Sequence, residues 1–139
     1  MVHALKEAYR ILTPNGTMMD MRPLSVDVPL EIIHTGGRDN AGMIDTSPGI
    51  EFDVAAEDAI ASVLKEGLFF ERNVENFDFT LFWKSIRAMQ AYIEEKWKDD
   101  VIISEEVWRQ AKKLLKMYRP QSKIRVGIQM KMGKYEKLG

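Results

Sequence analysis

Residues 4–20 read ALKEAYRILTPNGTMMD, and this stretch decides which fold the sequence predicts. Its first part carries apolar side chains at helical spacing, namely Leu5, Ala8, Tyr9 and Leu12. The triplet Pro14-Asn15-Gly16 ends this helix, because proline cannot continue the helical hydrogen bonds and Asn-Gly tolerates a positive φ. Thr17 to Met21 then predicts a short apolar strand, buried on both faces and closed by Arg22-Pro23. A helix, a tight turn and a buried strand form half of a βαβ crossover, so we expect its first strand to be missing.

Further elements follow from the patterns downstream of this strand. Residues 30–34 predict a second short strand, and residues 42–45 predict either its partner or a loop. Asp53 is the predicted N-cap of a helix that Gly67 ends, and Ser85 and Ser104 are the predicted caps of two later helices. Residues 68–72 and 77–83 predict a pair of strands or one interrupted strand, because they are rich in aromatic and β-branched types.

The last segment carries the clearest strand pattern in the sequence. Apolar residues alternate there with lysine, arginine, glycine and glutamine, at Ile124, Val126, Ile128, Met130 and Met132. A period of two over this length predicts a strand with one packed face and one solvated face.

Residues 4–20 also resemble a segment of class I S-adenosylmethionine-dependent methyltransferases. In that family, a helix with the pattern l-x-E-x-x-R-v-L-k-P-x-G leads into the fifth strand of a seven-stranded sheet. The positions that fall on this pattern are Glu7, Arg10, Leu12, Pro14 and Gly16, while Thr13 and Asn15 stand where lysine and glycine are common. Residues 68–93 are similar to the sixth strand and the element after it. Residues 126–135 are similar to the seventh strand, which in that family is antiparallel to the rest.

The resemblance covers only the second half of the family's domain. Family members hold the methyl donor with a glycine-rich turn after the first strand, an acidic residue ending the second, and residues following the fourth. Glycine is needed at that turn because only glycine lets the backbone approach the cofactor closely. This sequence contains no G-x-G-x-x-G or G-x-G, so we expect the donor-binding half to be absent and carry over none of its residues. No cofactor is expected for the chain alone, and S-adenosylmethionine only if a partner chain completes the site.

Composition excludes several other classes of function. A formal net charge of -1 gives no global attraction to nucleic acid or to an anionic membrane. The absence of cysteine excludes disulfides, thiolate metal sites and a cysteine nucleophile. No apolar run approaches the roughly 20 residues of a membrane span, and we expect a cytoplasmic protein. Neither His3 nor His34 has a second histidine at ligand spacing, so no metal site is predicted.

Two short stretches contain the polar residues that are candidates for a substrate pocket. Loop residues 34–40 bring together His34 as a general base, Arg38 as an anion clamp and the neighbouring Asp39. Asp20 and Arg22 close the first strand, where the family builds its substrate pocket. The alternatives are a polar loop with glycine turns for the first group and a local ion pair for the second. No catalytic residue is assigned.

The sequence therefore predicts an α/β protein with a single domain over residues 1–139. We expect a partial Rossmann-type methyltransferase fold: a small mixed sheet, equivalent to strands 5, 6 and 7, with about four helices. The function expected is that of a methyltransferase-like protein without a donor-binding motif, non-catalytic alone and acting as an oligomer or auxiliary subunit.

Two alternatives remain for the function. One is a methyltransferase active only with a second chain that supplies the donor site. The other is a polyanion- or RNA-binding module that uses the basic C-terminal segment, although nucleic acid is not the expected partner. The expected partner is a second copy of the chain, bound through the edge of the Thr17–Met21 strand and the first helix, or else a chain carrying the donor-binding half. No membrane association is expected.

Overall fold

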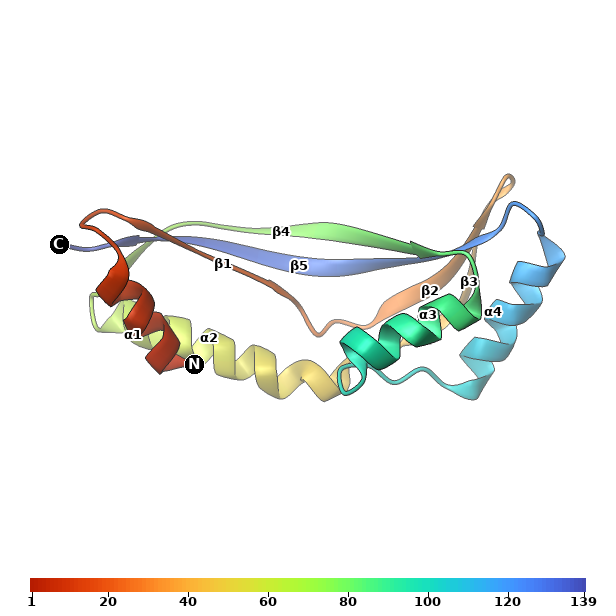
Figure 1. The fold of residues 1–139 in the computed structure, drawn as a ribbon, viewed down its shortest axis with the longest axis horizontal. Helices are drawn as coiled ribbons and strands as arrows, with labels where there is room; N and C mark the ends of the chain where they lie inside the picture. Colours follow the sequence, from red (N-terminus) through yellow and green to blue (C-terminus); the bar gives the residue numbers. More distant parts are fainter. The chain divides into compact units, whose positions relative to one another are not determined.

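The computed structural model describes residues 1–139 and has an α/β fold (Figure 1). The helices are α1 (Val2–Ile11), α2 (Ile50–Lys65), α3 (Ile86–Tyr92) and α4 (Glu105–Met117). The strands are β1 (Thr17–Pro23), β2 (Val28–His34), β3 (Gly37–Ile44), β4 (Phe69–Trp83) and β5 (Lys123–Lys137). A short 3-10 turn (Ser47–Gly49) precedes α2, and a π-helical turn (Ile93–Trp97) follows α3. None of the helices combines the length and the apolar character that crossing a membrane requires.

Most helix starts lie where the sequence predicts them. The hydroxyl of Ser85 accepts the N–H of Ala88 at 3.1 Å, and that of Ser104 accepts the N–H of Val107 at 3.3 Å. Both serines are therefore N-caps, as predicted. Asp53 is not a cap. The helix α2 begins at Ile50, directly after the 3-10 turn, so Asp53 lies inside the helix.

The five strands form one antiparallel sheet. β5 pairs with β1, β2 and β4, and β2 also pairs with β3. The registers of β1 with β5, β2 with β3 and β2 with β5 are all antiparallel. The start of β4 lies beside the end of β5, where the N–H of Leu138 donates to the carbonyl of Leu68 at 3.0 Å. The expected mixed sheet is wrong, because β1 and β4 do not pair with each other and each has β5 as its neighbour.

Contacts divide the chain into two compact units. Unit 1 consists of Met1–Leu24, Ile50–Phe77 and Gln129–Gly139. Unit 2 consists of Ser25–Gly49 and Asp78–Ile128. Both β4 and β5 are long strands, with one part in each unit. The predicted interruption of β4 does not occur, since the strand is continuous over 15 residues.

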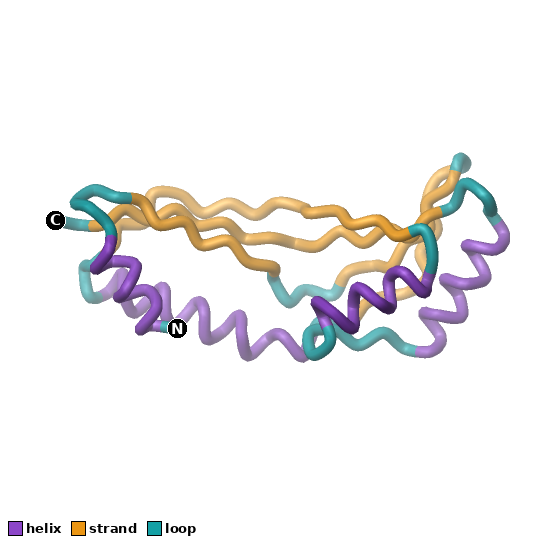
Figure 2. Tube along the Cα trace, in the orientation of Figure 1, coloured by secondary structure: helices purple, strands orange, loops and turns teal.

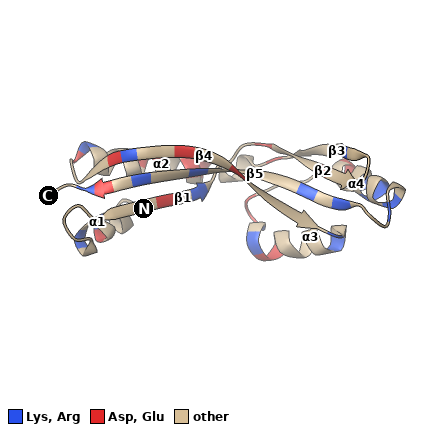
Figure 3. Cartoon of the chain, turned by 90° about the horizontal axis from the view of Figure 1, so that it is seen from above, with Lys and Arg blue, Asp and Glu red and all other residues tan.

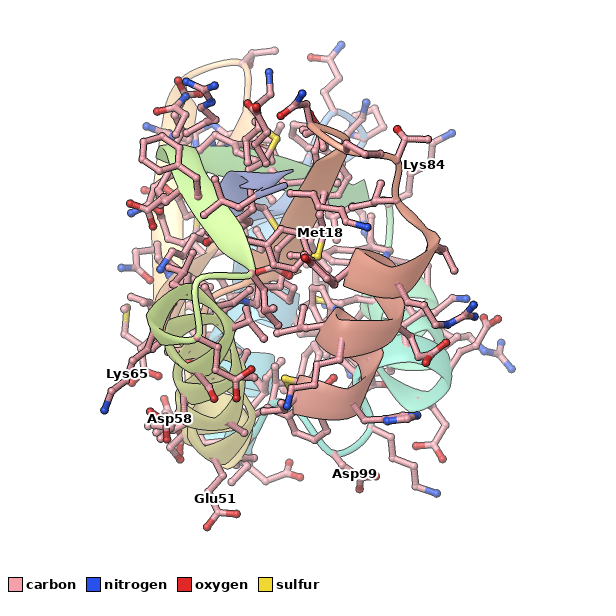
Figure 4. All side chains as sticks on the ribbon, turned by 90° about the vertical axis from the view of Figure 1, so that its left-hand side faces the viewer. Met18, Glu51, Asp58, Lys65, Lys84 and Asp99 are labelled. Atoms are coloured by element: carbon pink, nitrogen blue, oxygen red, sulfur yellow. The ribbon has the colours of Figure 1, made fainter.

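Unit 1 has a single layer of helices against its strands. α1 and α2 lie on the same side of β1, β5 and the first part of β4 (Figures 1 and 2). The core between them is built on Ile60, Val63, Phe69 and Tyr135, and Met18 of β1 packs into it. Charged residues of α2, among them Glu51, Asp58 and Lys65, point away from this core (Figure 4).

Unit 2 is built around β2, which has a neighbouring strand on each edge. Its Leu30 and Ile32 are completely buried, together with Met89 of α3 and Ala111 of α4. α4 lies so close to β3 that a Cβ at Gly42 would stand 2.6 Å from the Val107 side chain. Gly42 also has a φ of +137°, which favours glycine.

β1 does not have the two buried faces that the sequence predicts. None of its residues is buried, and Met19 and Met21 are 59% and 61% exposed. The even-numbered side chains of β1 face the helices, as Met18 does, whereas the odd-numbered ones face away. The prediction is wrong because an apolar run shows which side chains prefer burial, and the single helical layer of unit 1 covers one face.

β5 packs a different set of side chains in each unit. In unit 2 the even-numbered Ile124 and Val126 are buried, as the alternating pattern predicts. In unit 1 the odd-numbered Gly133 and Tyr135 are buried instead. Met130 and Met132, which the pattern assigns to the packed face, pair with residues on the uncovered side of β1.

Candidate functional site

Asp20 and Arg22 lie on the helix-facing side of β1, in unit 1. The Arg22 side chain is only 13% exposed, and its Nε donates to the Asp20 carboxylate at 3.3 Å. One terminal nitrogen of Arg22 reaches the Asp53 carbonyl at 3.4 Å, and the other pairs with the Glu57 carboxylate. Lys131 of β5 pairs with the same Glu57 carboxylate.

This cluster is a closed network of two cations and two carboxylates. The hydrogen bond from Lys131, aided by one from Arg22, holds the pKa of Glu57 below its ordinary value. Each of the three guanidinium nitrogens of Arg22 already has a partner on its own chain. The arrangement therefore ties β1 and β5 to α2 and does not offer a free cation to an anionic substrate.

His34 and Asp39 meet at the end of the hairpin formed by β2 and β3, in unit 2. The His34 Nε2 lies 2.9 Å from an Asp39 carboxylate oxygen, and its Nδ1 accepts the N–H of Gly36. The imidazole stacks on the ring of Tyr118, with centroids 3.6 Å apart. A hydrogen bond to Asp39 raises the pKa of the Tyr118 hydroxyl. Because both nitrogens of His34 are engaged, the geometry does not present it as a general base.

Arg38 pairs with Glu31 instead of forming an anion clamp. Its guanidinium lies 3.6 Å from the Glu31 carboxylate, which also accepts a 2.8 Å hydrogen bond from Arg125. Glu31 stands opposite Arg125 in the register of β2 and β5, so the pairing follows from strand alignment.

The contacts thus collect the five candidates into local pairs, and the pair of Asp20 with Arg22 is the local ion pair given as the alternative. Asp20 contacts Arg22 in unit 1, while in unit 2 His34 contacts Asp39 and Arg38 contacts Glu31. The partners that the sequence analysis missed are Glu31, Glu57, Tyr118, Arg125 and Lys131. Except for Glu31, which lies on the strand that pairs with the strand of Arg38, their side chains come from distant segments, and no sequence spacing signals that they meet their partners.

β1 also has an unpaired backbone edge. Gly16 and Leu24, which flank β1, both hydrogen bond to β5, through the Gly16 carbonyl and the Leu24 N–H. Since strand bonding alternates with a period of two, the even-numbered residues of β1 bond to β5. Thr17, Met19 and Met21 therefore direct their N–H and C=O groups to the other edge, where no strand pairs with β1.

Apolar side chains collect on the sheet face of unit 1 that the helices leave uncovered. Met21 lies opposite Met132 and Pro23 lies opposite Met130, and residues opposite each other share a face. Arg72 of β4 reaches this face, because its Nε lies 2.6 Å from Glu136 and Glu136 stands opposite Thr17.

We call this uncovered surface the outer face of unit 1, and seven residues of β1, β4 and β5 form it. Phe70 belongs to it because the Arg72 guanidinium lies 5.2 Å from the centroid of the Phe70 ring. Phe70 is half exposed, like Met19 and Met21. The members are Met19, Met21, Pro23, Phe70, Arg72, Met130 and Met132.

Comparison of this chain with protein-family models, curated proteins and solved structures gave no match. The structure also contains no group of three or more histidine, aspartate or glutamate side chains placed to hold a metal ion.

Proposed function

We propose that this chain is a methyltransferase-like protein that acts through association with other chains and not through chemistry of its own. The observation that carries the proposal is a contrast within the molecule. All five polar candidates are engaged with partners on their own chain, whereas the edge of β1 and the outer face of unit 1 are free. Exposed apolar surface of this kind marks interaction sites.

Three features of unit 1 support the methyltransferase-like part of the proposal. α1 leads through the turn at residues 14–16 into β1, in the order that the resemblance implies. Glu7 and Arg10 form the expected pair on α1, with 3.0 Å between their charged groups. β1 runs antiparallel to the last strand, as the fifth and seventh strands of the family do. We also propose that the protein is located in the cytoplasm.

The partner that we propose first is a second copy of the chain, bound through β1 and α1. α1 contributes no buried residue, and its Ile11 is 71% exposed. A chain carrying the donor-binding half is the second candidate, because the open edge of β1 suits a further strand from either source. With that chain the protein becomes part of an active methyltransferase.

Isothermal titration of the purified chain with S-adenosylmethionine tests the proposal. We expect no measurable binding, since no segment of the chain forms a glycine-rich donor site. Binding of one donor per chain with a micromolar or tighter Kd would overturn the non-catalytic assignment.

A further inference from the structure

We propose that β1 pairs with β1 of a second copy in an antiparallel register centred on Met19, which joins the two sheets into one. This inference rests on the proposed function and deepens it by naming the register of the two strands and the residues that meet there.

The outward backbone groups of β1 are complementary to themselves. A two-fold axis perpendicular to the sheet makes the adjoining strands of the two copies antiparallel and keeps their faces on the same side. With the axis at Met19, Met19 meets Met19 of the second copy and Thr17 meets Met21 of the second copy. These are the three residues whose N–H and C=O groups point to the open edge, so every one of those groups gains a partner.

Shifted registers satisfy fewer groups or oppose like charges. A register centred on Asp20 places the two Asp20 side chains opposite each other, which is unfavourable. A register centred on Met21 brings Pro23 opposite Met19 of the second copy, and proline has no N–H to donate. In the Met19 register, Asp20 stands opposite Met18 of the second copy and Pro23 lies beyond the paired segment.

The charge on β1 favours self-pairing more than the charge on β4 does. β1 carries one acidic and one basic residue, Asp20 and Arg22, and these neutralise each other (Figure 3). β4 is also an edge strand, but in unit 1 its Glu71 and Glu75 alternate with Asn73 between them. Two copies of β4 paired about Asn73 would place carboxylates opposite each other, and charges of this kind protect a strand edge from association.

Pairing through β1 also shelters the most exposed part of the outer face. Met19 and Met21 are 59% and 61% exposed in the single chain, and both lie on the uncovered side of the sheet. In the Met19 register, Met19 and Met21 gain neighbours on the same face of the sheet, namely the odd-numbered side chains of β1 in the second copy. The association therefore buries methionine side chains as well as satisfying backbone groups.

Disulfide cross-linking tests this register directly, because the chain has no cysteine of its own. Directly opposed residues in a hydrogen-bonded antiparallel pair have Cα atoms about 5.5 Å apart, a distance that a disulfide spans. We expect Met19→Cys to form a covalent dimer on mild oxidation, and a mixture of Thr17→Cys and Met21→Cys chains to form the mixed dimer. Met21→Cys alone should not cross-link, because its two copies would lie more than about 13 Å apart.

Met43→Cys is the matched control for random collision. Met43 lies on β3 in unit 2 and is 50% exposed, so it resembles Met19 in accessibility but lies outside the proposed interface. Cross-linking of Met19→Cys no faster than that of Met43→Cys would overturn the proposal. Preferential cross-linking of Met21→Cys would overturn the register.

A second measurement does not depend on cysteine chemistry. Met19→Lys places two like charges against each other at the centre of the interface, and we expect it to weaken the dimer roughly tenfold. Light scattering of the unsubstituted chain at micromolar concentration should give about twice its 16.0 kDa mass. A monomer under these conditions would overturn the pairing, whereas donor binding in the titration above would overturn the proposed function and leave the pairing intact.

Discussion

β1 and β2 follow one another in the chain and pair antiparallel with the same strand, yet their burial differs completely. β2 buries Leu30 and Ile32 with 0% exposure, whereas β1 buries no residue. Composition accounts for part of the difference, since β1 carries Asp20 and Arg22, but its methionines Met19 and Met21 are exposed as well. β2 has a strand on each edge and α4 against its face, while β1 has one neighbouring strand and one covered face. The number of neighbouring elements therefore decides whether apolar side chains such as those methionines are buried.

The largest loss of stability is expected when a buried side chain of β2 is truncated. Ile32→Ala should reduce the free energy of unfolding by about 2–5 kcal/mol, because it leaves a cavity at a fully buried site. Met21→Ala in β1 should change it by no more than about 0.5 kcal/mol in the monomer, where its side chain is exposed.

Urea denaturation followed by tryptophan fluorescence measures the effect of Ile32→Ala, since Trp83, Trp97 and Trp108 all lie in unit 2. For Met21→Ala, far-ultraviolet circular dichroism at several protein concentrations separates folding from association. Equal losses in both variants at low concentration would contradict the comparison.

A smaller effect is expected where α4 is pressed against the strand next to β2. Gly42→Ala combines a strained φ of +137° with a contact of 2.6 Å to Val107, and should cost about 1–3 kcal/mol. Gly37→Ala is its matched control, since Gly37 has a φ of +132° but nothing within 4 Å of the added Cβ. Thermal unfolding of both variants isolates the cost of the helix contact. Identical shifts in Tm would show that only the backbone conformation matters.

The start of α4 gives the next effect in size. Ser104→Ala removes the side chain that accepts the N–H of Val107, and we expect a loss of about 0.5–2 kcal/mol. Ser104→Asp keeps an accepting oxygen at the cap and should retain most of the stability. Chemical denaturation of the two variants distinguishes them, and a stable Ser104→Ala chain would argue that packing alone holds α4 over β2.

The smallest effect concerns the cluster that ties β1 to α2. Because the pKa of Glu57 is lowered in the folded chain, its ionised form stabilises unit 1 above the ordinary carboxyl pKa, and this contribution is lost as the pH falls through the lowered value. The contribution should be well under 1 kcal/mol and decrease with salt, since Glu57 is about half exposed.

A nuclear magnetic resonance titration of the Glu57 carboxyl group measures this pKa directly. Glu57→Gln should make the stability of unit 1 less dependent on pH below about pH 5. If the pKa of Glu57 were at or above the ordinary value of a glutamate, Lys131 and Arg22 would not stabilise its ionised form, and the cluster would not tie β1 to α2.

The sequence alone determined where α3 and α4 start and where the turn before β1 lies. Ser85 and Ser104 were recognisable as caps because capping needs only a hydroxyl and an amide three residues away. Pro14 to Gly16 marked the turn before β1, since backbone restrictions of proline and glycine act locally. The pair of Glu7 and Arg10 followed from helical spacing for the same reason.

Only the tertiary structure decided which side chains are covered and which polar groups meet. The apolar residues of β1 and the alternating residues of β5 record a preference for burial, but the helices that satisfy it come from other parts of the chain. Met130 and Met132 therefore continue the pattern of Ile124 and Val126, yet they are only partly buried and stand opposite Pro23 and Met21 of β1. Arg22 reaches Glu57 for a similar reason: 35 residues separate them, and no local rule joins them. Local geometry is encoded in neighbouring residues, whereas burial depends on what the remaining chain, or a second one, brings to the surface.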